Sequence, residues 1–278
     1  MLLKPNAINL SDSHVMAIVN VTPDSFYSTS RNHTKEECRK TVERVIAEGA
    51  TIVDIGGYST RPGADEVSLE EEWARVRMGL EAVKSLDEGV VVSIDTFRSV
   101  IVERAYAEYG EFIVNDISAG VQDDAMADVV AHCDIPYVAM HMRGDSSTMQ
   151  SMTEYEDGVV TDVKSYLMRR CEELQQRGIK RESLIIDPGF GFAKTAEQNF
   201  ELFRGLDSLR ELGYPILIGV SRKSMIYKSL GVTPEESLSG SLVLAWEALR
   251  GGNVILRVHD VAQTVQVLRL ANIYNQRL

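Results

Sequence analysis

The residues of this chain best suited to chemistry stand at the ends of short apolar runs. There are eight such runs, and each ends in polar side chains, namely Asn20, Asp54, Asp95, Asn115 with Asp116, His141, Asp187, Ser221 to Lys223, and Arg257 with His259. An unpaired buried charge is costly, so a scaffold held by packing alone would not need carboxylates there. Asp54, Asp116 and His141 can equally well cap a helix or tie a strand to a loop. The set as a whole predicts a binding or catalytic site.

These polar groups divide by charge. Asp95, Asn115 and Asp187 offer acceptors and amide donors to a flat heterocycle, because a carboxylate can take two parallel hydrogen bonds from an amino-pyrimidinone edge. The opposite sign, which suits a phosphate or pyrophosphate, comes from Arg61, Lys223, Arg257 and His259. A heterocyclic pyrophosphate ester would satisfy both groups. The cations predict a positive patch.

The apolar runs are rich in β-branched residues and predict strands that are buried on both faces, as in a parallel sheet. They are residues 14–20, 51–57, 90–96, 112–118, 136–142, 183–188, 214–221 and 253–260. Helical patterns alternate with them, over 35–48, 69–84, 98–109, 123–132, 155–177, 196–212, 234–250 and 261–274. Eight such units predict a single (β/α)8 TIM barrel over residues 1–278, whose strand ends meet at one mouth.

The main alternative is a doubly wound open sheet. That fold usually has a glycine-rich phosphate-binding turn after its first strand, whereas this chain has NVTPDSF at residues 20–26. The barrel is therefore the better interpretation.

Composition limits the partners and the compartment. The 278 residues carry 29 basic and 41 acidic side chains, and this formal net charge of −12 argues against nucleic acid and anionic membranes. The surplus acid is expected on outer helices, in runs such as Glu70 to Glu72. No apolar run is long enough to span a bilayer, and the first residues lack the features of a signal peptide. Cys38, Cys133 and Cys171 have no disulfide or zinc spacing, so we expect reduced thiols in a cytoplasmic protein.

Eight ordered motifs resemble those of the dihydropteroate synthase family. They are NVTPDSF (20–26), DIGGYSTRPGA (54–64), SIDT (93–96), NDIS (115–118), MHMRG (140–144), DPGFGFAKT (187–195), SRKSMI (221–226) and RVHDV (257–261). The resemblance implies a transferase that joins 6-hydroxymethyl-7,8-dihydropterin pyrophosphate to p-aminobenzoate and releases 7,8-dihydropteroate and pyrophosphate. It further implies sulfonamides as inhibitors, Mg²⁺ as cofactor and a homodimer.

The resemblance also implies roles for single residues. The pterin site would comprise Asp95, Asn115, Asp187 and Lys223. The pyrophosphate would contact Asn20, Arg61, Arg257 and His259, with Asn20 also reaching the Mg²⁺. The p-aminobenzoate end would comprise Thr60, Arg61, Pro62, Phe192, Lys223 and Ser224. The residues closest to the chemistry would be Asp95, Lys223, Arg61, Arg257 and His259, with pyrophosphate leaving before the aromatic amine attacks.

Some positions depart from the family pattern, and other functions remain open. Tyr27–Ser30 replaces a flexible Ser-Asp-Gly-Gly loop, Tyr58 replaces a glutamate, and Ala193 replaces a glycine. These changes motivate the alternative of a pterin-binding paralogue without catalytic activity. A methyltetrahydrofolate–corrinoid methyltransferase would have no use for the cations. A Schiff-base aldolase would need a lysine with a depressed pKa, which the polar neighbours of Lys223 do not predict.

Overall fold

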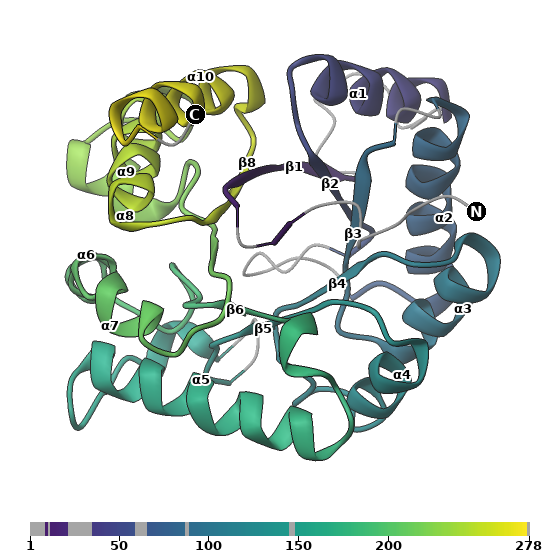
Figure 1. The fold of residues 1–278 in the computed structure, drawn as a ribbon, viewed down its shortest axis with the longest axis horizontal. Coiled ribbons are helices and arrows are strands. Elements are labelled where there is room, and N and C mark those ends of the chain that lie inside the picture. The colour runs from purple at the N-terminus through teal and green to yellow at the C-terminus, as the bar shows by residue number, and fades with distance from the viewer. Residues whose placement is uncertain are drawn as a thin grey trace.

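The structure is a computed structural model that describes residues 9–10, 12–21, 35–58, 66–86, 89–144 and 148–276. Within these residues eight parallel strands surround a central axis (Figure 1). The strands are β1 (His14–Asn20), β2 (Ile52–Gly56), β3 (Val91–Asp95), β4 (Ile113–Asp116), β5 (Tyr137–Met140), β6 (Leu184–Asp187), β7 (Leu217–Ile218) and β8 (Ile255–Val258). Their order is β6-β5-β4-β3-β2-β1-β8-β7, and a parallel bridge between Ile186 and Ile216 joins the two ends. The predicted barrel is confirmed.

The helices form an outer ring around the strands (Figure 1). In the described residues they are α1 (Lys35–Ala47), α2 (Leu69–Leu86), α3 (Ser99–Tyr109), α4 (Met126–Cys133), α5 (Val159–Gln176), α6 (Ala196–Arg204), α7 (Leu206–Arg210), α8 (Ser224–Leu230), α9 (Leu238–Gly251) and α10 (Val261–Tyr274).

Three of these helices, α6, α7 and α8, differ in number or presence from the sequence prediction. The single helix expected over residues 196–212 is divided at Gly205, where a Cβ atom would lie 2.7 Å from both γ-carbons of Val160. The sequence pattern did not predict α8, which is short because Gly231 ends it in the left-handed conformation.

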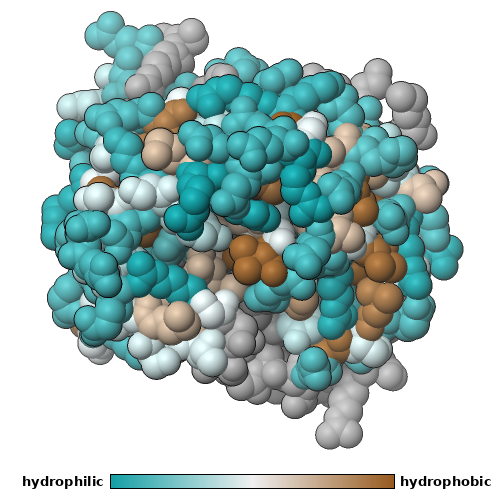
Figure 2. Space-filling view, turned by 90° about the horizontal axis from the view of Figure 1, so that it is seen from below, coloured by the Kyte–Doolittle hydropathy of each residue, from teal (hydrophilic) through white to brown (hydrophobic). Residues whose placement is uncertain are grey.

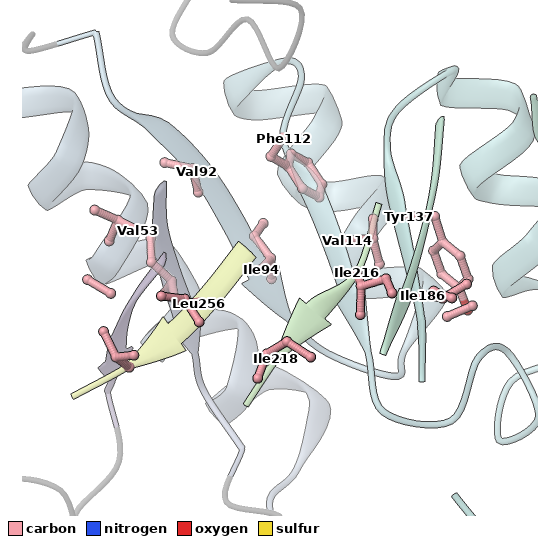
Figure 3. Packing of buried hydrophobic residues seen from close by; sticks show 14 of the residues in the cluster. Val53, Val92, Ile94, Phe112, Val114, Tyr137, Ile186, Ile216, Ile218 and Leu256 are labelled. Atoms are coloured by element: carbon pink, nitrogen blue, oxygen red, sulfur yellow. The ribbon is translucent and has the colours of Figure 1, made fainter. Parts of the chain in front are cut away.

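The strands face two different environments on their two sides. Inside the barrel, each strand contributes one apolar side chain to a floor made of Met16, Ile52, Val91, Ile113, Val138, Ile185, Leu217 and Ile255. The alternate residues point outward and pack against the helices in one large cluster, part of which is shown in Figure 3. Burial on both faces explains why the strands read as nearly continuous apolar runs.

One face of the molecule is mainly polar. The face shown in Figure 2 is largely hydrophilic, with brown residues scattered among the teal ones. Cys38, Cys133 and Cys171 are buried free thiols. In the part of the chain that the structure describes, no helix combines the length and apolarity needed to cross a membrane.

Gly79 on α2 shows how closely the helices approach the strands. A Cβ atom at Gly79 would lie 2.5 Å from Ile55 Cγ2 on β2. Although alanine favours helix formation by about 1 kcal/mol over glycine, we predict that Gly79→Ala destabilises the protein by about 1–3 kcal/mol through overpacking. Chemical denaturation measures this change.

The matched control is the same substitution in an Ile55→Ala background, which removes the side chain that the new methyl group meets. The two losses should then be clearly less than additive. Additive losses would show that the contact between Gly79 and Ile55 does not limit the helix position.

Candidate functional site

The site lies directly above the apolar floor of the barrel. Because side chains alternate along a strand, residues two or four positions beyond a floor residue also point inward. This rule places six of the predicted residues at the mouth, namely Asn20, Asp54, Asp95, Asn115, Asp187 and Arg257. The strand register brings them together, since Asn20 pairs with Gly56, Gly56 with Asp95, and Asp95 with Asn115.

Arg257 connects the carboxylates of this layer. Its Nε donates to Asp54 Oδ2 at 2.6 Å, and its Nη2 donates to Asp95 Oδ2 at 2.7 Å. Asn115 Nδ2 donates to the same Asp54 oxygen at 3.1 Å. Burial raises the pKa of Asp95 to about 7 against the opposing charge of Arg257. Burial alone would lower the pKa of Arg257, but Asp54 and Asp95 raise it above its usual range.

Two buried polar atoms in this layer lack a hydrogen-bond partner among the described residues. They are Asp54 Oδ1 and Ser93 Oγ, and both residues are fully buried. Buried polar atoms in native proteins are nearly always satisfied, so within the described residues these two atoms are available to a bound ligand or an ordered water. The layer is therefore built to receive polar groups.

The second part of the site joins β6 to the segment after β7. Asp187 Oδ1 accepts a 2.7 Å hydrogen bond from Gly189 N, and burial raises the pKa of Asp187. Lys223 Nζ donates to the carbonyl oxygen of Phe190 and lies 4.4 Å from the centroid of the Phe192 ring. Burial lowers the pKa of Lys223 to about 8, and the charge of Asp187 opposes that shift.

These charges correct two expectations. Lys223 does have a depressed pKa, so its polar neighbours in the sequence were a wrong reason to set the aldolase aside. The described mouth is also not a positive patch, because Asp54, Asp95 and Asp187 lie beside Arg257 and Lys223. It is a layer of mixed charge in which each ion depends on its neighbours.

Ser221, His259 and Ser224 complete the described part of the mouth. Ser221 Oγ lies 3.2 Å from His259 Nδ1 and accepts from the His259 backbone N–H at the same distance. Ser224 begins α8, directly after Lys223. Arg222 is directed to Asp260 instead, through hydrogen bonds of 2.9 and 2.6 Å. The remaining predicted contacts, Thr60, Arg61 and Pro62, and the loop Tyr27–Ser30 lie outside the described residues.

The residues that the sequence left open now have contacts. Asp116 points outward and accepts hydrogen bonds of 2.7–2.8 Å from Ser118 N, Ser118 Oγ, Gly120 N and Tyr137 Oη, which fix the turn after β4. His141 also faces outward, and its Nδ1 lies 2.9 Å from Lys194 Nζ. Asp54 alone among the three belongs to the mouth.

Two buried charged residues were missed or misplaced. Glu72, expected among solvated acids, is fully buried and accepts from Thr96 Oγ1 at 2.6 Å and Arg98 Nη1 at 2.8 Å. Helical spacing could have revealed it, because Glu72 shares a face with Val76 and Gly79. Lys194 is 5% exposed, and nothing in its glycine-rich surroundings distinguishes it from a surface lysine.

Arg98 also contacts one of the departures from the family pattern. Its guanidinium lies 5.2 Å from the Tyr58 ring centroid, and Tyr58 packs edge-on against Phe97. Tyr58 therefore makes a cation–π contact with Arg98 at this position.

The oxygen atoms at the mouth fit a hard cation. A Cβ atom at Gly56 would lie 3.0 Å from Asn20 Oδ1 and 3.8 Å from Asp95 Oδ2, so the absence of a side chain leaves both oxygens facing one space. Mg²⁺ prefers such oxygen ligands and usually keeps waters and substrate phosphates as further ligands. Among the described residues, no group of three or more His, Cys, Asp or Glu side chains has the arrangement of a metal site. A metal here would need ligands from its substrate.

Comparisons with known proteins agree with this arrangement. Residues 16–259 match the family model described as pterin binding enzyme. The dihydropteroate synthase of Escherichia coli K12 is 42% identical over 264 residues, which cover 95% of this chain and 92% of that protein.

Solved structures are similar over nearly the whole chain. A Yersinia pestis dihydropteroate synthase with a sulfonamide drug has a TM-score of 0.90 and 35% identity, covering 97% of this chain and 96% of that one. The Xanthomonas albilineans dihydropteroate synthase in complex with 7,8-dihydropteroate has a TM-score of 0.85 and 35% identity, covering 96% and 95%.

The ion pairs of Arg257 lead to a stability prediction. Arg257→Met leaves the carboxylates of Asp54 and Asp95 buried without their cation, and we expect a loss of about 3–5 kcal/mol at neutral or higher pH. The loss should shrink towards about pH 5, because burial already raises the pKa of Asp95 to about 7 and its carboxyl group is then protonated in the folded variant. Urea denaturation at several pH values measures it.

Arg257→Lys is the matched control, since it keeps a cation and should lose less. A loss in Arg257→Met that is the same at every pH would contradict the charge pairing and point to lost packing alone.

Proposed function

The chain belongs to the dihydropteroate synthases, a family of pterin-binding enzymes, and on that premise we propose how its mouth joins 6-hydroxymethyl-7,8-dihydropterin pyrophosphate to p-aminobenzoate. The products are 7,8-dihydropteroate and pyrophosphate. The observation that carries the proposal is the buried layer of Asp54, Asp95, Asn115, Asp187 and Arg257 above an apolar floor.

The pterin ring lies in this layer, on Asp95, Asn115, Asp187 and Lys223. Asp187 accepts from the 2-amino group and the ring N–H, which form a two-donor edge that matches a carboxylate. The free Oδ1 of Asp54 and the free Oγ of Ser93 support a polar ligand at this depth. The apolar floor below sets how deeply the ring can enter.

The pyrophosphate lies nearer the opening, on Asn20, Arg61, Arg257 and His259. Arg257 has two carboxylate partners before substrate arrives, so a phosphate oxygen must share or replace its bond to Asp95. That exchange leaves Asp95 available beside the pterin, where its charge stabilises a cation. Binding of the phosphate to Arg257 is thereby coupled to the release of Asp95 towards the pterin.

The reaction separates into departure and attack. The bond between the pterin methylene carbon and the pyrophosphate oxygen breaks, and both electrons leave with the pyrophosphate. The positive charge is delocalised from the methylene into the ring, near Asp95. The amine lone pair of p-aminobenzoate then forms the new C–N bond, and the nitrogen loses one proton. No side chain acts as a nucleophile.

The p-aminobenzoate lies between the loop residues Thr60, Arg61 and Pro62 and the described residues Phe192, Lys223 and Ser224. The ring of Phe192 offers an apolar wall, and the ammonium of Lys223 offers a charge for the substrate carboxylate. Sulfonamides share the aniline end of p-aminobenzoate and would occupy the same place as inhibitors.

A Mg²⁺ ion is part of the proposal, and the fit of Asn20 and Asp95 across Gly56 supports it. When bound, the metal would neutralise charge on the departing pyrophosphate. Asn20 supplies a neutral oxygen ligand, so retention of the metal would depend on the substrate phosphates.

A homodimer and a cytoplasmic location complete the proposal. Of nine large apolar residues that are exposed in the described part, five lie on α8, α9 and α10, namely Leu230, Val243, Leu270, Ile273 and Tyr274. This concentration supports self-association there, which sedimentation equilibrium measures directly. The buried free thiols support a reducing compartment, which localisation of a tagged chain would test.

Two other functions fit the site less well. A corrinoid methyltransferase would not need Arg257 and Lys223 beside its pterin, and the mixed charge of the mouth favours a pyrophosphate ester instead. A paralogue without catalytic activity would use the same pterin site, and it would differ from the enzyme only in releasing no pyrophosphate. The test is release of pyrophosphate from purified protein given the pterin pyrophosphate, p-aminobenzoate and Mg²⁺, with a chelator as control. Pterin binding without release would favour the paralogue.

Asp187→Asn tests the pterin site. Both donors on the pterin edge lose their charged acceptor, and one of them then faces the amide NH2, which is itself a donor, so affinity should fall by about 10-fold or more. Calorimetric titration with the pterin pyrophosphate measures the change. Asp260→Asn is the control, because Asp260 pairs with Arg222 away from the pterin layer. Unchanged affinity in Asp187→Asn would contradict the assignment.

The pKa of Lys223 predicts a pH dependence. Burial lowers it to about 8, so Lys223 is an ammonium below this pH and increasingly a neutral amine above it. The KM for p-aminobenzoate should therefore rise between about pH 7 and about pH 9, while Lys223→Arg, whose guanidinium stays charged, should show no such rise. Steady-state kinetics across this range decides. A KM for p-aminobenzoate that is flat in the wild-type enzyme would remove Lys223 from that subsite.

A further inference from the structure

Lys194 is a buried lysine that the proposed reaction does not use. Its Nζ lies 2.9 Å from His141 Nδ1, 2.9 Å from the carbonyl oxygen of Gly189 and 3.0 Å from that of Phe192. An ammonium has three N–H donors, and these three acceptors match them. Lys194 is 5% exposed, and because protein acceptors engage all three of its donors, it has none left for a substrate.

The carbonyl groups that Lys194 holds belong to the loop between β6 and α6. In this loop Phe192 N donates to Gly189 O at 3.1 Å, and Gly191 N donates to Asn199 Oδ1 at 2.7 Å. Phe190 lies between Gly189 and Gly191 in the chain, and its carbonyl oxygen accepts a hydrogen bond from Lys223 Nζ. Lys194 therefore contacts the loop on its buried side, and Lys223 contacts it from the mouth.

Gly189 and Ala193 in this loop have left-handed backbone conformations. Ala193 has a φ of 52°, in the left-handed region where a side chain causes strain. Gly189 has a φ of 69° and approaches His141 so closely that a Cβ atom would lie 2.0 Å from the His141 carbonyl oxygen. Side-chain contacts must stabilise the turn, and Lys194 makes two of them.

We propose that Lys194 is a positioning residue for the p-aminobenzoate end of the site: by fixing the carbonyl groups of Gly189 and Phe192, it aligns the Phe192 ring and the Phe190 carbonyl with Lys223. The inference rests on the proposed function, because it assigns a purpose to the subsite that contains Phe192 and Lys223. The pterin layer shares Lys223 with this subsite, and Gly189 N donates to Asp187 Oδ1. Its ion pairs of Arg257 with Asp54 and Asp95 lie outside the loop, so we expect Lys194 to affect pterin binding less than p-aminobenzoate binding.

The chemistry around His141 agrees with a fixed role. Burial lowers the pKa of His141, and its ring packs edge-on against Tyr166 at a centroid distance of 4.9 Å. A neutral ring with Nδ1 as acceptor suits a lysine donor. Burial also lowers the pKa of Lys194, and the charge of Asp187 opposes this shift. Neither group faces the opening, so neither is placed to exchange protons with a substrate.

The test is Lys194→Met, which keeps the length of the side chain and removes its donors. The KM for p-aminobenzoate should rise by about tenfold or more, while the affinity for the pterin pyrophosphate, measured by calorimetry, stays within about threefold of the wild-type value. The alkaline rise in KM that Lys223 produces should also shift, because Lys223 loses the alignment of its carbonyl partner. If the substitution only reduced the amount of folded protein, the KM for p-aminobenzoate and the affinity for the pterin pyrophosphate would not change by different factors.

Controls keep the outcomes distinct. Lys164→Met removes an outer lysine, on α5, that pairs with Glu211, and it should leave both quantities unchanged. If Lys194→Met does not fold, Lys194→Gln, which retains two N–H donors, should show the same selective rise. A KM for p-aminobenzoate within about twofold of wild type, or an equal loss of both substrates, would overturn the inference. Absence of turnover in the wild-type protein would instead overturn the proposed function.

Discussion

The structure depends on one arrangement of buried charge, in which Arg257 lies between Asp54 and Asp95 inside the barrel. Such ions are tolerated away from water only in mutual contact. Arg257 reaches both carboxylates because β8 pairs with β1, β1 with β2 and β2 with β3, so that β8, β2 and β3 present these side chains to one point. The same contacts that satisfy these ions hold them ready for a ligand that can exchange with one of them.

The alternation of side chains along each strand separates two kinds of polar residue. Asn115 points into the barrel and binds Asp54, whereas the next residue, Asp116, points outward and fixes a turn. Asp187 faces the mouth, whereas His141, which directly follows the neighbouring strand β5, faces the helices and contacts Lys194. Inward groups are available to substrates, and outward groups hold the loops that surround those substrates. A polar strand end is therefore functional or structural according to its direction.

Much of this arrangement follows from sequence patterns alone. All eight strands and the barrel were predictable from the apolar runs and their alternation with helical patterns. Asp95, Asn115, Asp187 and Arg257 were predictable from their place at strand ends, whereas the role of Asp54 was left open. Direction was predictable too, because counting by twos from a floor residue separates Asn115 from Asp116.

What the sequence did not reveal depends on contacts between distant segments. The partners of Arg257 are 203 and 162 residues away along the chain, and no local pattern shows that its charge is already paired. The lowered pKa of Lys223 arises from burial against other strands, and the role of Lys194 arises from a loop that folds back over it. Helix α8 is too short for its period to be read.

The charge arrangement at the mouth can be tested on the free protein by carbon-13 NMR of the Asp95 side-chain carboxyl group, assigned with Asp95→Asn. Burial should place its titration midpoint near 7, and the pterin pyrophosphate should move that midpoint as Arg257 turns to phosphate. A midpoint at the ordinary value for aspartate, about 3.9, with no response to the ligand would contradict the account.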